Sequence, residues 1–403
     1  MPSSLSTLAD VLPELADSLQ AHTETPALDA QVLLAHLLGR PRTWIIAHHE
    51  AILTEEQKTS LAALAARLQT GEPLPYVLGH QEFYGLDFSL TPDVLIPRPE
   101  TELLVERTAA WLRRHPTRRA ALEVGTGSGC IAIALAVQIP DLALQATDIS
   151  LAALDVARRN AHVHGVAGRI TFSQADLFPV SAQGATAQPA FDILCANLPY
   201  IPTPTLHQLP IYGREPSLAL DGGPDGLTLI RRLLDQASQQ IRPEGLVILE
   251  IEASQGASVH QLAQAAFPKA RTQILRDLAG KDRVIEVDMT ESSPIVHLCE
   301  RSAWQAAQPQ GQYRPAAFAQ EGFIHCSRPD QVVAVANRYY HGMQNMVLLW
   351  IDPQRLEAAL RWEESGHGVF PHIYGPLNTG AVTAVTDFSP DADGTFRTYQ
   401  LPG

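Results

Sequence analysis

The stretch Phe191-Asp-Ile-Leu-Cys-Ala-Asn-Leu-Pro-Tyr200 decides the fold of the central part of this chain. Its first six residues are mostly apolar and strand-forming, which predicts a strand that is buried in a sheet. Pro199 ends the strand because proline has no N–H for the hydrogen bonds of a sheet. The sequence therefore places the Asn197 carboxamide at the carboxyl end of a strand, where ligands bind in an open parallel sheet.

Strands and helices alternate through residues 119–290, and an antiparallel pair of strands closes the series. Such alternation predicts an α/β fold with a mostly parallel, Rossmann-like sheet. The expected strands are residues 120–124, 142–147, 169–173, 191–196, 245–251, 273–275 and 283–288.

The first 72 residues are predicted to form a small helical domain. Apolar residues recur there at the spacing of one helix face, at Ala30, Leu33, Leu34 and Leu37. Residues 73–118 are predicted to hold a linker and a β-hairpin that turns at Gly85. Arg98 and Glu100 alternate with prolines, which indicates a stiff loop placed for recognition; a simple interdomain linker is the alternative.

Length, charge and cysteine spacing restrict the class of protein. The 403 residues are enough for two or three domains, and the formal net charge is −14. Nucleic-acid binders usually carry a basic face, so this charge disfavours direct nucleic-acid binding without excluding a local basic patch. No apolar run approaches the roughly 20 residues of a membrane span. The four cysteines form no Cys-x-x-Cys pair, so we expect reduced thiols, no metal site and a cytoplasmic location.

The loop between the first strand and its helix is rich in glycine, and its residues are Gly125, Thr126, Gly127, Ser128 and Gly129. Glycines there let the backbone approach a nucleotide closely, and no Lys-Ser/Thr follows, which excludes a phosphate-binding P-loop. Asp148 follows about twenty residues later, where a carboxylate can accept both hydroxyls of a ribose. Glu123 lies two positions before the loop, where a carboxylate suits a cation and not the pyrophosphate of NAD.

The end of the third strand supplies further candidate residues. Asp176 follows that strand and can accept from the amino group of adenine, with Leu177 beside it. Taken together with Glu123, the glycine loop and Asp148, this pattern predicts S-adenosylmethionine as the cofactor. The Asn197 side chain is expected to border both the cofactor and the substrate.

Asn197 suits chemistry on a planar –NH2 group. Its side-chain oxygen can accept one N–H of the substrate and the backbone carbonyl of Leu198 can accept the other. Two acceptors that localise the nitrogen lone pair stabilise the transition state for methylation more than the ground state. The alternative is that Asn197, Pro199 and Tyr200 only form a turn.

The sequence resembles the peptide chain release factor glutamine N5-methyltransferases over about residues 5–290. The matching stretches are Pro75–Gly79, Ile96–Glu102, Glu123–Gly129, Asn197–Tyr200, Glu215–Pro216 and Ala219–Leu227. The resemblance implies that the substrate is the glutamine of the Gly-Gly-Gln loop of bacterial release factors. It also implies that residues 1–72 help to dock the factor, that Tyr200 packs on the glutamine, and that Arg98 and Glu100 lie near the active site.

This sequence departs from the family pattern at two positions. Leu198 stands where the family has proline, but the expected acceptor is a backbone carbonyl, so we expect activity to survive. Glu252 stands where glycine is common, and we expect at most a change in loop shape.

Residues 294–403 form a third unit, which resembles a small bacterial domain family of uncharacterised function and implies an α+β fold. Its histidines and a serine are candidates for a polar pocket, although their spacing does not support a metal site and structural histidines are the alternative. These residues are His297, His325, Ser327 and His372.

Two other functions remain open from the residues alone. An adenine N6 amino methyltransferase would present the same –NH2 geometry to Asn197, but it would be expected to carry a basic groove. A scaffold that keeps only the cofactor fold is disfavoured by the intact Asn197, Pro199, Tyr200 and Asp148.

Overall fold

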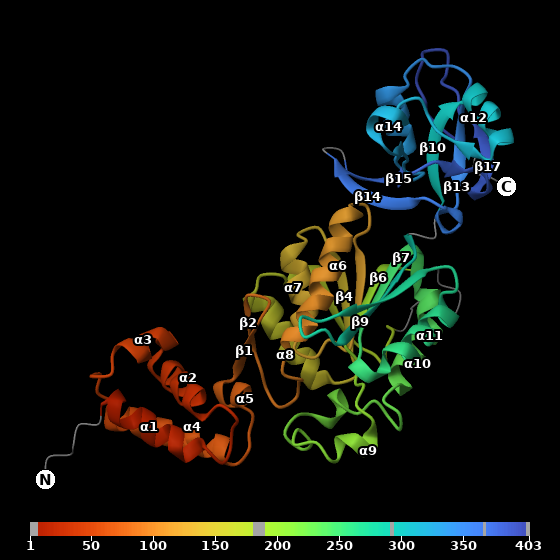
Figure 1. The fold of residues 1–403 in the computed structure, drawn as a ribbon. Helices are drawn as coiled ribbons and strands as arrows, with labels where there is room; N and C mark the ends of the chain where they lie inside the picture. Colours follow the sequence, from red (N-terminus) through yellow and green to blue (C-terminus); the bar gives the residue numbers. More distant parts are fainter. Residues whose placement is uncertain (1–6, 180–189, 291–293, 366–367, 400–403) are drawn as a thin grey trace, which may run out of the picture.

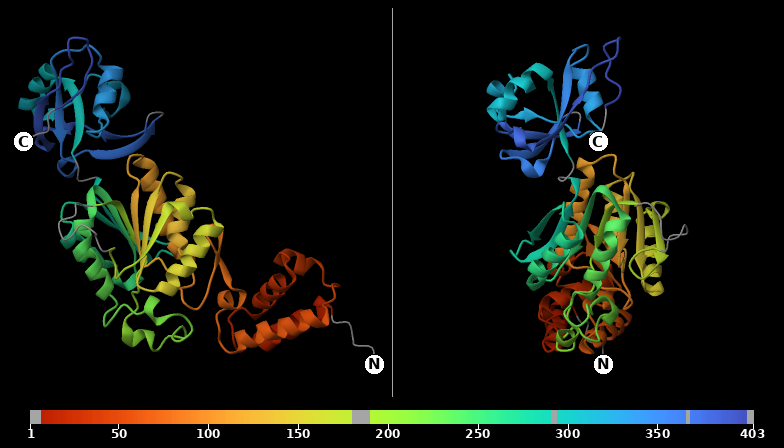
Figure 2. Two further views of the ribbon diagram at one scale, coloured as in Figure 1. Left: turned by 180° about the vertical axis from the view of Figure 1, so that it is seen from behind. Right: turned by 90° about the vertical axis from the view of Figure 1, so that its right-hand side faces the viewer.

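The computed structural model describes residues 7–179, 190–290, 294–365 and 368–399, and it contains three units arranged in a row (Figures 1 and 2). The first unit is helical, as predicted, and a core of leucines and alanines holds it together. Thr54 caps its longest helix by accepting a hydrogen bond from the backbone N–H of Gln57. The helices are α1 (Leu8–Leu19), α2 (Pro26–Leu38), α3 (Arg42–Ala47), α4 (Glu55–Gln69) and α5 (Leu74–Leu78).

A β-hairpin leads from the helical unit to the central sheet. It consists of β1 (His80–Phe83) and β2 (Leu86–Ser89), which pair antiparallel. The two turn residues, Tyr84 and Gly85, have φ of 54° and 74°. A two-residue turn with both residues left-handed matches the twist of the flanking strands, so the predicted turn at Gly85 is confirmed.

The central sheet has seven strands in the order β5-β4-β3-β6-β7-β9-β8. The first five pair in parallel, whereas β9 is antiparallel to both β7 and β8, so the predicted sheet is confirmed. The strands are β3 (Ala120–Val124), β4 (Ala143–Asp148), β5 (Ile170–Gln174), β6 (Phe191–Ala196), β7 (Ile241–Glu250), β8 (Arg271–Arg276) and β9 (Asp282–Asp288).

Helices cover both faces of this sheet (Figure 1). Ile193 and Cys195 of β6 face the core beneath α6 and α7, while Leu194 and Ala196 face the core beneath α10 and α11. Because both faces are buried, β6 is apolar at successive positions and shows no alternation. The helices of this unit are α6 (Glu102–Arg114), α7 (Cys130–Gln138), α8 (Leu151–Val163), α9 (Thr203–Leu206), α10 (Thr228–Gln240) and α11 (Gly256–Ala266).

The C-terminal unit is α+β, as predicted. Its two larger sheets are three-stranded, with the orders β10-β13-β17 and β12-β15-β14. The strands are β10 (Ile295–Glu300), β11 (Gln312–Tyr313), β12 (Ile324–His325), β13 (Met346–Ile351), β14 (Ala359–Ser365), β15 (Gly368–Tyr374), β16 (Leu377–Asn378) and β17 (Val382–Asp387). The helices are α12 (Arg301–Ala307), α13 (Phe318–Glu321) and α14 (Val332–Tyr339). None of the helices in the described ranges combines the length and apolarity that a bilayer crossing requires.

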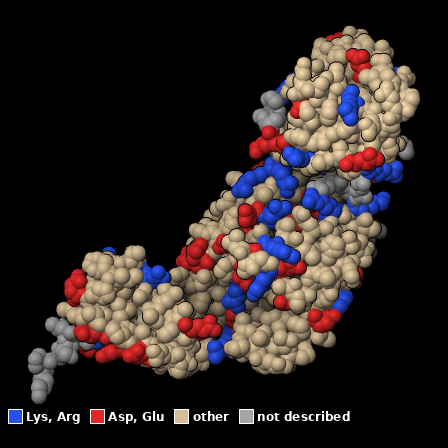
Figure 3. Space-filling view, viewed as in Figure 1, with Lys and Arg blue, Asp and Glu red and all other residues tan. Residues whose placement is uncertain are grey.

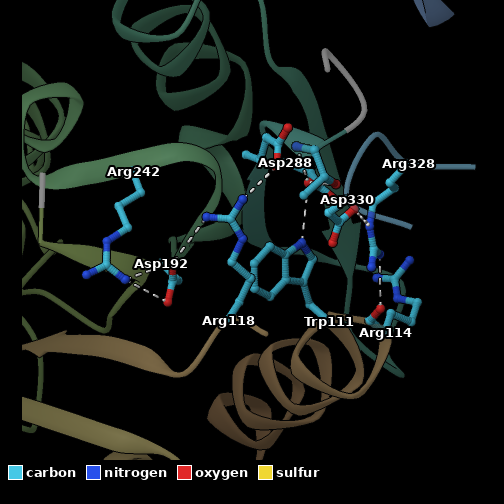
Figure 4. A network of polar contacts seen from close by, with 10 residues as sticks. Trp111, Arg114, Arg118, Asp192, Arg242, Asp288, Arg328 and Asp330 are labelled. Atoms are coloured by element: carbon cyan, nitrogen blue, oxygen red, sulfur yellow. Dashed lines mark hydrogen bonds and ion pairs between the residues drawn. The ribbon is translucent and has the colours of Figure 1, made fainter. Parts of the chain in front are cut away.

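The C-terminal unit packs against the amino-terminal edge of the central sheet (Figure 4). Arg328 donates a hydrogen bond from Nη1 to the backbone oxygen of Arg114, at the end of α6, over 3.4 Å. Arg118, which precedes β3, and Trp362 of β14 line a small cleft between the two units. This edge is opposite to the one where Asn197 follows β6.

Asp192 is the single charged residue of β6, and its side chain is 3% exposed. Its Oδ2 accepts hydrogen bonds from the backbone N–H groups of Arg119 and Ala120, both over 3.0 Å. Arg118 and Arg242 approach its carboxylate from either side, at 3.3 and 3.2 Å (Figure 4). The aspartate therefore fixes the start of β3 against the start of β6.

Replacement of Asp192 is expected to destabilise the protein. Asp192→Ala leaves two partly buried N–H groups without this acceptor, and each loss should lower the free energy of unfolding by roughly 1–3 kcal/mol. Urea unfolding of both proteins measures the difference. Asp155→Ala is the matched control, because its ion pair with Arg158 is exposed and should contribute less than about 1 kcal/mol. Equal losses in the two variants would contradict the structural role of Asp192.

Candidate active site

A cavity of about 400 Å³ opens at the carboxyl ends of β3, β4 and β6. The strand order reverses at β3, whose two neighbours are β4 and β6, and such a reversal leaves a crevice for a ligand. Among the predicted site residues, the cavity lining includes Arg98, Glu123, Gly125, Thr126, Gly127, Asp148, Asp176, Leu177, Asn197, Leu198 and Pro199. Gly129, Tyr200 and Glu100 lie outside the lining.

The glycine loop between β3 and α7 brings the backbone close to neighbouring elements. Gly129 has a φ of 83°, and a Cβ there would lie 2.9 Å from Ile133 Cδ1 and 3.1 Å from Ala157 Cβ. Gly125 has a φ of 75°, and its Cβ would lie 3.2 Å from Leu198 Cδ2. The positive φ disfavours larger residues at both positions, and Gly129 is in addition the more crowded of the two.

Asp148 is the last residue of β4, and its carboxylate is hydrogen-bonded to the glycine loop. Its Oδ2 accepts from the backbone N–H of Gly127 and its Oδ1 from that of Ser150, both over 2.9 Å. Burial raises the pKa of this carboxyl above its ordinary value. The carboxylate thus faces the cavity from a fixed position, which suits it to accept hydroxyl groups.

Glu123 is the most deeply buried carboxyl of the site. Its Oε2 accepts from Thr126 Oγ1 over 2.6 Å and from the backbone N–H of Ala132 over 3.1 Å. Its Oε1 is buried and has no hydrogen-bond partner among the described residues. Burial raises the pKa of Glu123 to about 8. A buried carboxylate with one free oxygen beside a cavity calls for a donor or a cation in that cavity.

Asp176 and Leu177 follow β5 at the rim of the cavity. The Asp176 carboxylate lies 2.8 Å from Arg232 of α10 and forms an ion pair with it. Leu177 has a φ of 73°, which is uncommon for a residue other than glycine, and its carbonyl accepts from Thr147 Oγ1 over 2.7 Å. Strained backbone of this kind is concentrated at ligand sites.

The tetrapeptide after β6 carries the residues expected to meet the substrate. Asn197 Nδ2 donates to Thr101 Oγ1 over 3.2 Å, and no described residue donates to its Oδ1. Leu198 is 5% exposed and packs in the core, as its position against Gly125 requires. Tyr200 donates from its hydroxyl to Glu250 over 3.2 Å. The tetrapeptide therefore presents one side-chain oxygen and its backbone to the cavity.

The segment 219–227 packs onto this tetrapeptide. A Cβ at Gly222 would lie 2.8 Å from the Pro199 carbonyl oxygen, so only glycine fits there. The backbone of Ile201 donates to Leu220 and accepts from Gly222, over 3.1 and 2.8 Å. This contact explains why a glycine-rich segment far along the chain accompanies the Asn-Leu-Pro-Tyr sequence.

Arg98 and Glu100 have different environments. Arg98 Nη2 lies 2.5 Å from Glu215 Oε1, and Glu215 Oε2 accepts from the backbone N–H of Ile96 over 3.1 Å. Arg98 therefore ties the proline-rich loop to the segment around Glu215. Glu100 is half-buried and lies near Tyr200, Glu250 and Arg283.

Sequence reasoning gave no role to three residues of this site, Thr101, Glu215 and Glu250, although the first two lie in stretches that match the family. The sequence did contain a signal for Glu250: it is a polar residue at the end of an apolar strand, a position comparable to that of Asn197 after β6. Glu252, which stands where the family commonly has glycine, accepts from the backbone N–H of Ser254 over 2.8 Å. It therefore caps a short helical turn outside the cavity.

Three histidines of the C-terminal unit are connected by close polar contacts. His325 Nδ1 lies 3.2 Å from His372 Nε2, and His372 Nδ1 lies 2.6 Å from Glu363. His297 is buried beside them: its Nδ1 lies 2.6 Å from the backbone oxygen of His325, and its Nε2 lies 3.2 Å from the Tyr313 hydroxyl. Ser327 is buried and its backbone pairs with Val296. No group of three or more His, Cys, Asp or Glu side chains in the described ranges is placed to hold a metal ion.

The cavity fits S-adenosylmethionine. The unpaired Oε1 of Glu123 offers a partner for a positively charged group, the glycine loop allows close approach, and Asp148 can accept the ribose hydroxyls. A pyrophosphate would meet the carboxyl group of Glu123 beside the glycine loop, and the two cations among the described lining residues, Arg98 and Arg232, are both paired with carboxylates.

Comparisons with known families match each of the three units. Residues 10–79 match the family described as PrmC N-terminal domain, residues 99–202 match the methyltransferase small domain, and residues 298–385 match a protein family of unknown function, DUF952. A crystal structure of a Caulobacter crescentus protein is 36% identical, with a TM-score of 0.25; the match covers 26% of this chain and 94% of that one.

Two curated relatives cover the first two units. The release factor glutamine methyltransferase of Moorella thermoacetica is 44% identical over 280 residues, which are 69% of this chain and 96% of the relative. That of Chlorobaculum tepidum is 41% identical over 267 residues, 64% of this chain and 89% of the relative. With these matches and the cavity built around Glu123, Asp148 and Asn197, the chain belongs to the release factor glutamine methyltransferase family.

Proposed function

We propose that this protein transfers a methyl group from S-adenosylmethionine to the side-chain amide nitrogen (N5) of the glutamine in the Gly-Gly-Gln motif of bacterial release factors. The observation that carries the proposal is the orientation of Asn197. Its Nδ2 is occupied by Thr101, so its Oδ1 is left to accept an N–H at the edge of a cavity that fits the cofactor.

Two acceptors of this chain activate the glutamine amide. An amide nitrogen is a poor nucleophile because its lone pair is delocalised into the carbonyl group. Asn197 Oδ1 and the Leu198 carbonyl accept its two N–H bonds and hold the nitrogen as it becomes tetrahedral. The cofactor supplies a methyl group on a positively charged sulfur. Correct positioning alone can lower the barrier by roughly 7–11 kcal/mol, and the proton leaves readily once the nitrogen is methylated.

The other residues of the site bind and orient. Glu123 faces the positive charge of the cofactor, Asp148 accepts from its ribose, and Asp176 and Leu177 border its adenine. Thr126 keeps Glu123 in place, and the glycines of the loop allow the approach. The Tyr200 ring packs on the glutamine side chain. Arg98 acts through Glu215 by holding the loop at the substrate entrance, next to Glu100.

The units divide the work along the chain, with proposed boundaries at 1–72, 73–118, 119–290 and 294–403. The helical unit docks the release factor, and the hairpin of residues 80–89 connects it to the catalytic unit. The C-terminal unit lies at the far edge of the sheet and takes no part in methyl transfer. We place the protein in the cytoplasm, where release factors act.

A nucleic-acid amino methyltransferase remains the second candidate, because adenine N6 has the same geometry. Figure 3 shows Lys and Arg in a row down the visible face of the catalytic unit, with Asp and Glu beside several of them. These acidic neighbours and the net charge of −14 favour the protein substrate.

Labelled S-adenosylmethionine distinguishes the substrates. The protein is incubated with a release factor, with the same factor carrying an altered loop glutamine, or with duplex DNA. We expect label only in the unaltered factor. Label in the DNA would support the nucleic-acid methyltransferase. Label in neither the release factor nor the DNA would contradict both candidate functions.

Asn197→Ala is expected to lower kcat by about 10²–10³, the effect of losing one oriented hydrogen-bonding group. Steady-state methylation of the release factor measures it. The matched variant Leu198→Pro keeps the backbone carbonyl and should stay within about fivefold of the parent. An Asn197→Ala enzyme within twofold of the parent would remove Asn197 from the mechanism.

Cofactor binding is expected to release a proton from Glu123. The pKa of about 8 means that the free carboxyl is mostly protonated at pH 7, whereas a bound cation favours the carboxylate. Affinity should therefore fall by up to about tenfold per pH unit as the pH drops below 8. Calorimetry in two buffers of different ionisation enthalpy measures the proton.

Glu123→Gln serves as the control for this titration. It should bind the cofactor more weakly, with no proton released by this residue and a flatter pH dependence. A parent enzyme that released no proton and bound equally well at pH 6 and pH 8 would contradict the assignment of Glu123.

A further inference from the structure

Glu250 is a buried carboxylate at the end of β7 that holds two donors from the active site. It is 1% exposed. Its Oε2 accepts from the Thr101 hydroxyl over 2.6 Å, and its Oε1 accepts from the Tyr200 hydroxyl over 3.2 Å. Thr101 stands at the start of α6 and Tyr200 ends the tetrapeptide after β6, so one side chain connects three elements at the site.

The contact with Glu250 determines the direction of the next hydrogen bond. A threonine hydroxyl has one hydrogen, and Thr101 donates it to Glu250. The hydroxyl oxygen can then only accept from Asn197, so the amide of Asn197 turns its Nδ2 inward, at 3.2 Å. Its Oδ1 is left for the substrate.

We infer that Glu250 is a positioning residue for methyl transfer, which acts through Thr101 to make Asn197 present an oxygen instead of an –NH2 group, and through Tyr200 to fix the aromatic ring. The inference rests on the proposed role of Asn197. An Asn197 with the opposite orientation would direct two donors at the glutamine –NH2 group, which is itself a donor, and would repel the substrate.

The surroundings of Glu250 set the conditions under which this chain of hydrogen bonds holds. The charged and titratable groups near it are Arg283 of β9, Glu100 before α6, Cys130 of α7 and Tyr200. Burial raises the pKa of Glu250 to about 7. Once protonated, Glu250 can donate to Thr101, whose hydrogen is then free to point at Asn197 and to favour the reversed amide. The carboxylate is therefore the active form, and activity should rise with pH through about 7.

Thr101 variants test the hydrogen-bond chain. Thr101→Val removes the hydroxyl at nearly constant shape and should lower kcat by about tenfold, with the dissociation constant of S-adenosylmethionine within twofold of the parent. Thr101→Ser restores the hydroxyl and should recover kcat to within about threefold. The matched control is Thr108→Val in α6, the helix that follows Thr101, because Thr108 is buried and donates to the Leu104 carbonyl, away from the cavity. It should lose stability but keep kcat.

The pH profile of kcat, at saturating cofactor and release factor, tests Glu250 itself. The parent should lose activity as the pH falls through about 7, whereas Glu250→Gln should have a lower kcat without this step. Thr101→Val should also lose the step. A parent without the step, or a Thr101→Val enzyme with full kcat or with the step retained, would overturn the inference.

Asn197→Ala separates this inference from the proposed function. If Asn197→Ala is inactive while Thr101→Val is fully active, only the role of Glu250 fails. If Asn197→Ala keeps full activity, the proposed mechanism and the inference fail together.

Discussion

The parallel pairing of β3 with β4 on one side and β6 on the other is the constraint on which the site depends. Val124 is in register with both Thr147 and Ala196, and Ala196 is in register with Leu249 of β7. The residues that follow these four positions therefore emerge at one level of the sheet edge. They are Gly125, Asp148, Asn197 and Glu250.

The same register brings several carboxyl groups together at that edge, where burial makes their charged forms less favourable. Burial raises the pKa of Glu123 to about 8 and of Glu250 to about 7, and it raises that of Asp148 as well. A sequence selected for stability alone would not place three carboxyl groups here. Each has a use that compensates: Glu123 meets a cation, Asp148 accepts hydroxyls, and Glu250 orders the donors around Asn197.

The sequence predicted the parts of the site that depend on local pattern. Strand ends, the glycine loop and the hairpin turn follow from residues that are neighbours in the chain, so Asn197, Asp148 and Glu123 could be placed in advance. The partners of these residues could not, because they are distant in sequence. Arg98 meets Glu215 across 117 positions and Asn197 meets Thr101 across 96. Arg98 was predicted to lie in a recognition loop, and the distant partner that the sequence did not reveal is the Glu215 carboxylate.

Helix α6 relates the active site to the C-terminal unit. Its first turn follows Thr101, whose hydroxyl holds Asn197 and Glu250, and its last residue, Arg114, accepts a hydrogen bond from Arg328 of the C-terminal unit. A helix of 13 residues is about 20 Å long, and α6 is packed against α7 and the sheet along this length. The C-terminal unit therefore contacts the far end of the helix whose start follows Thr101, although none of its described residues lines the cavity.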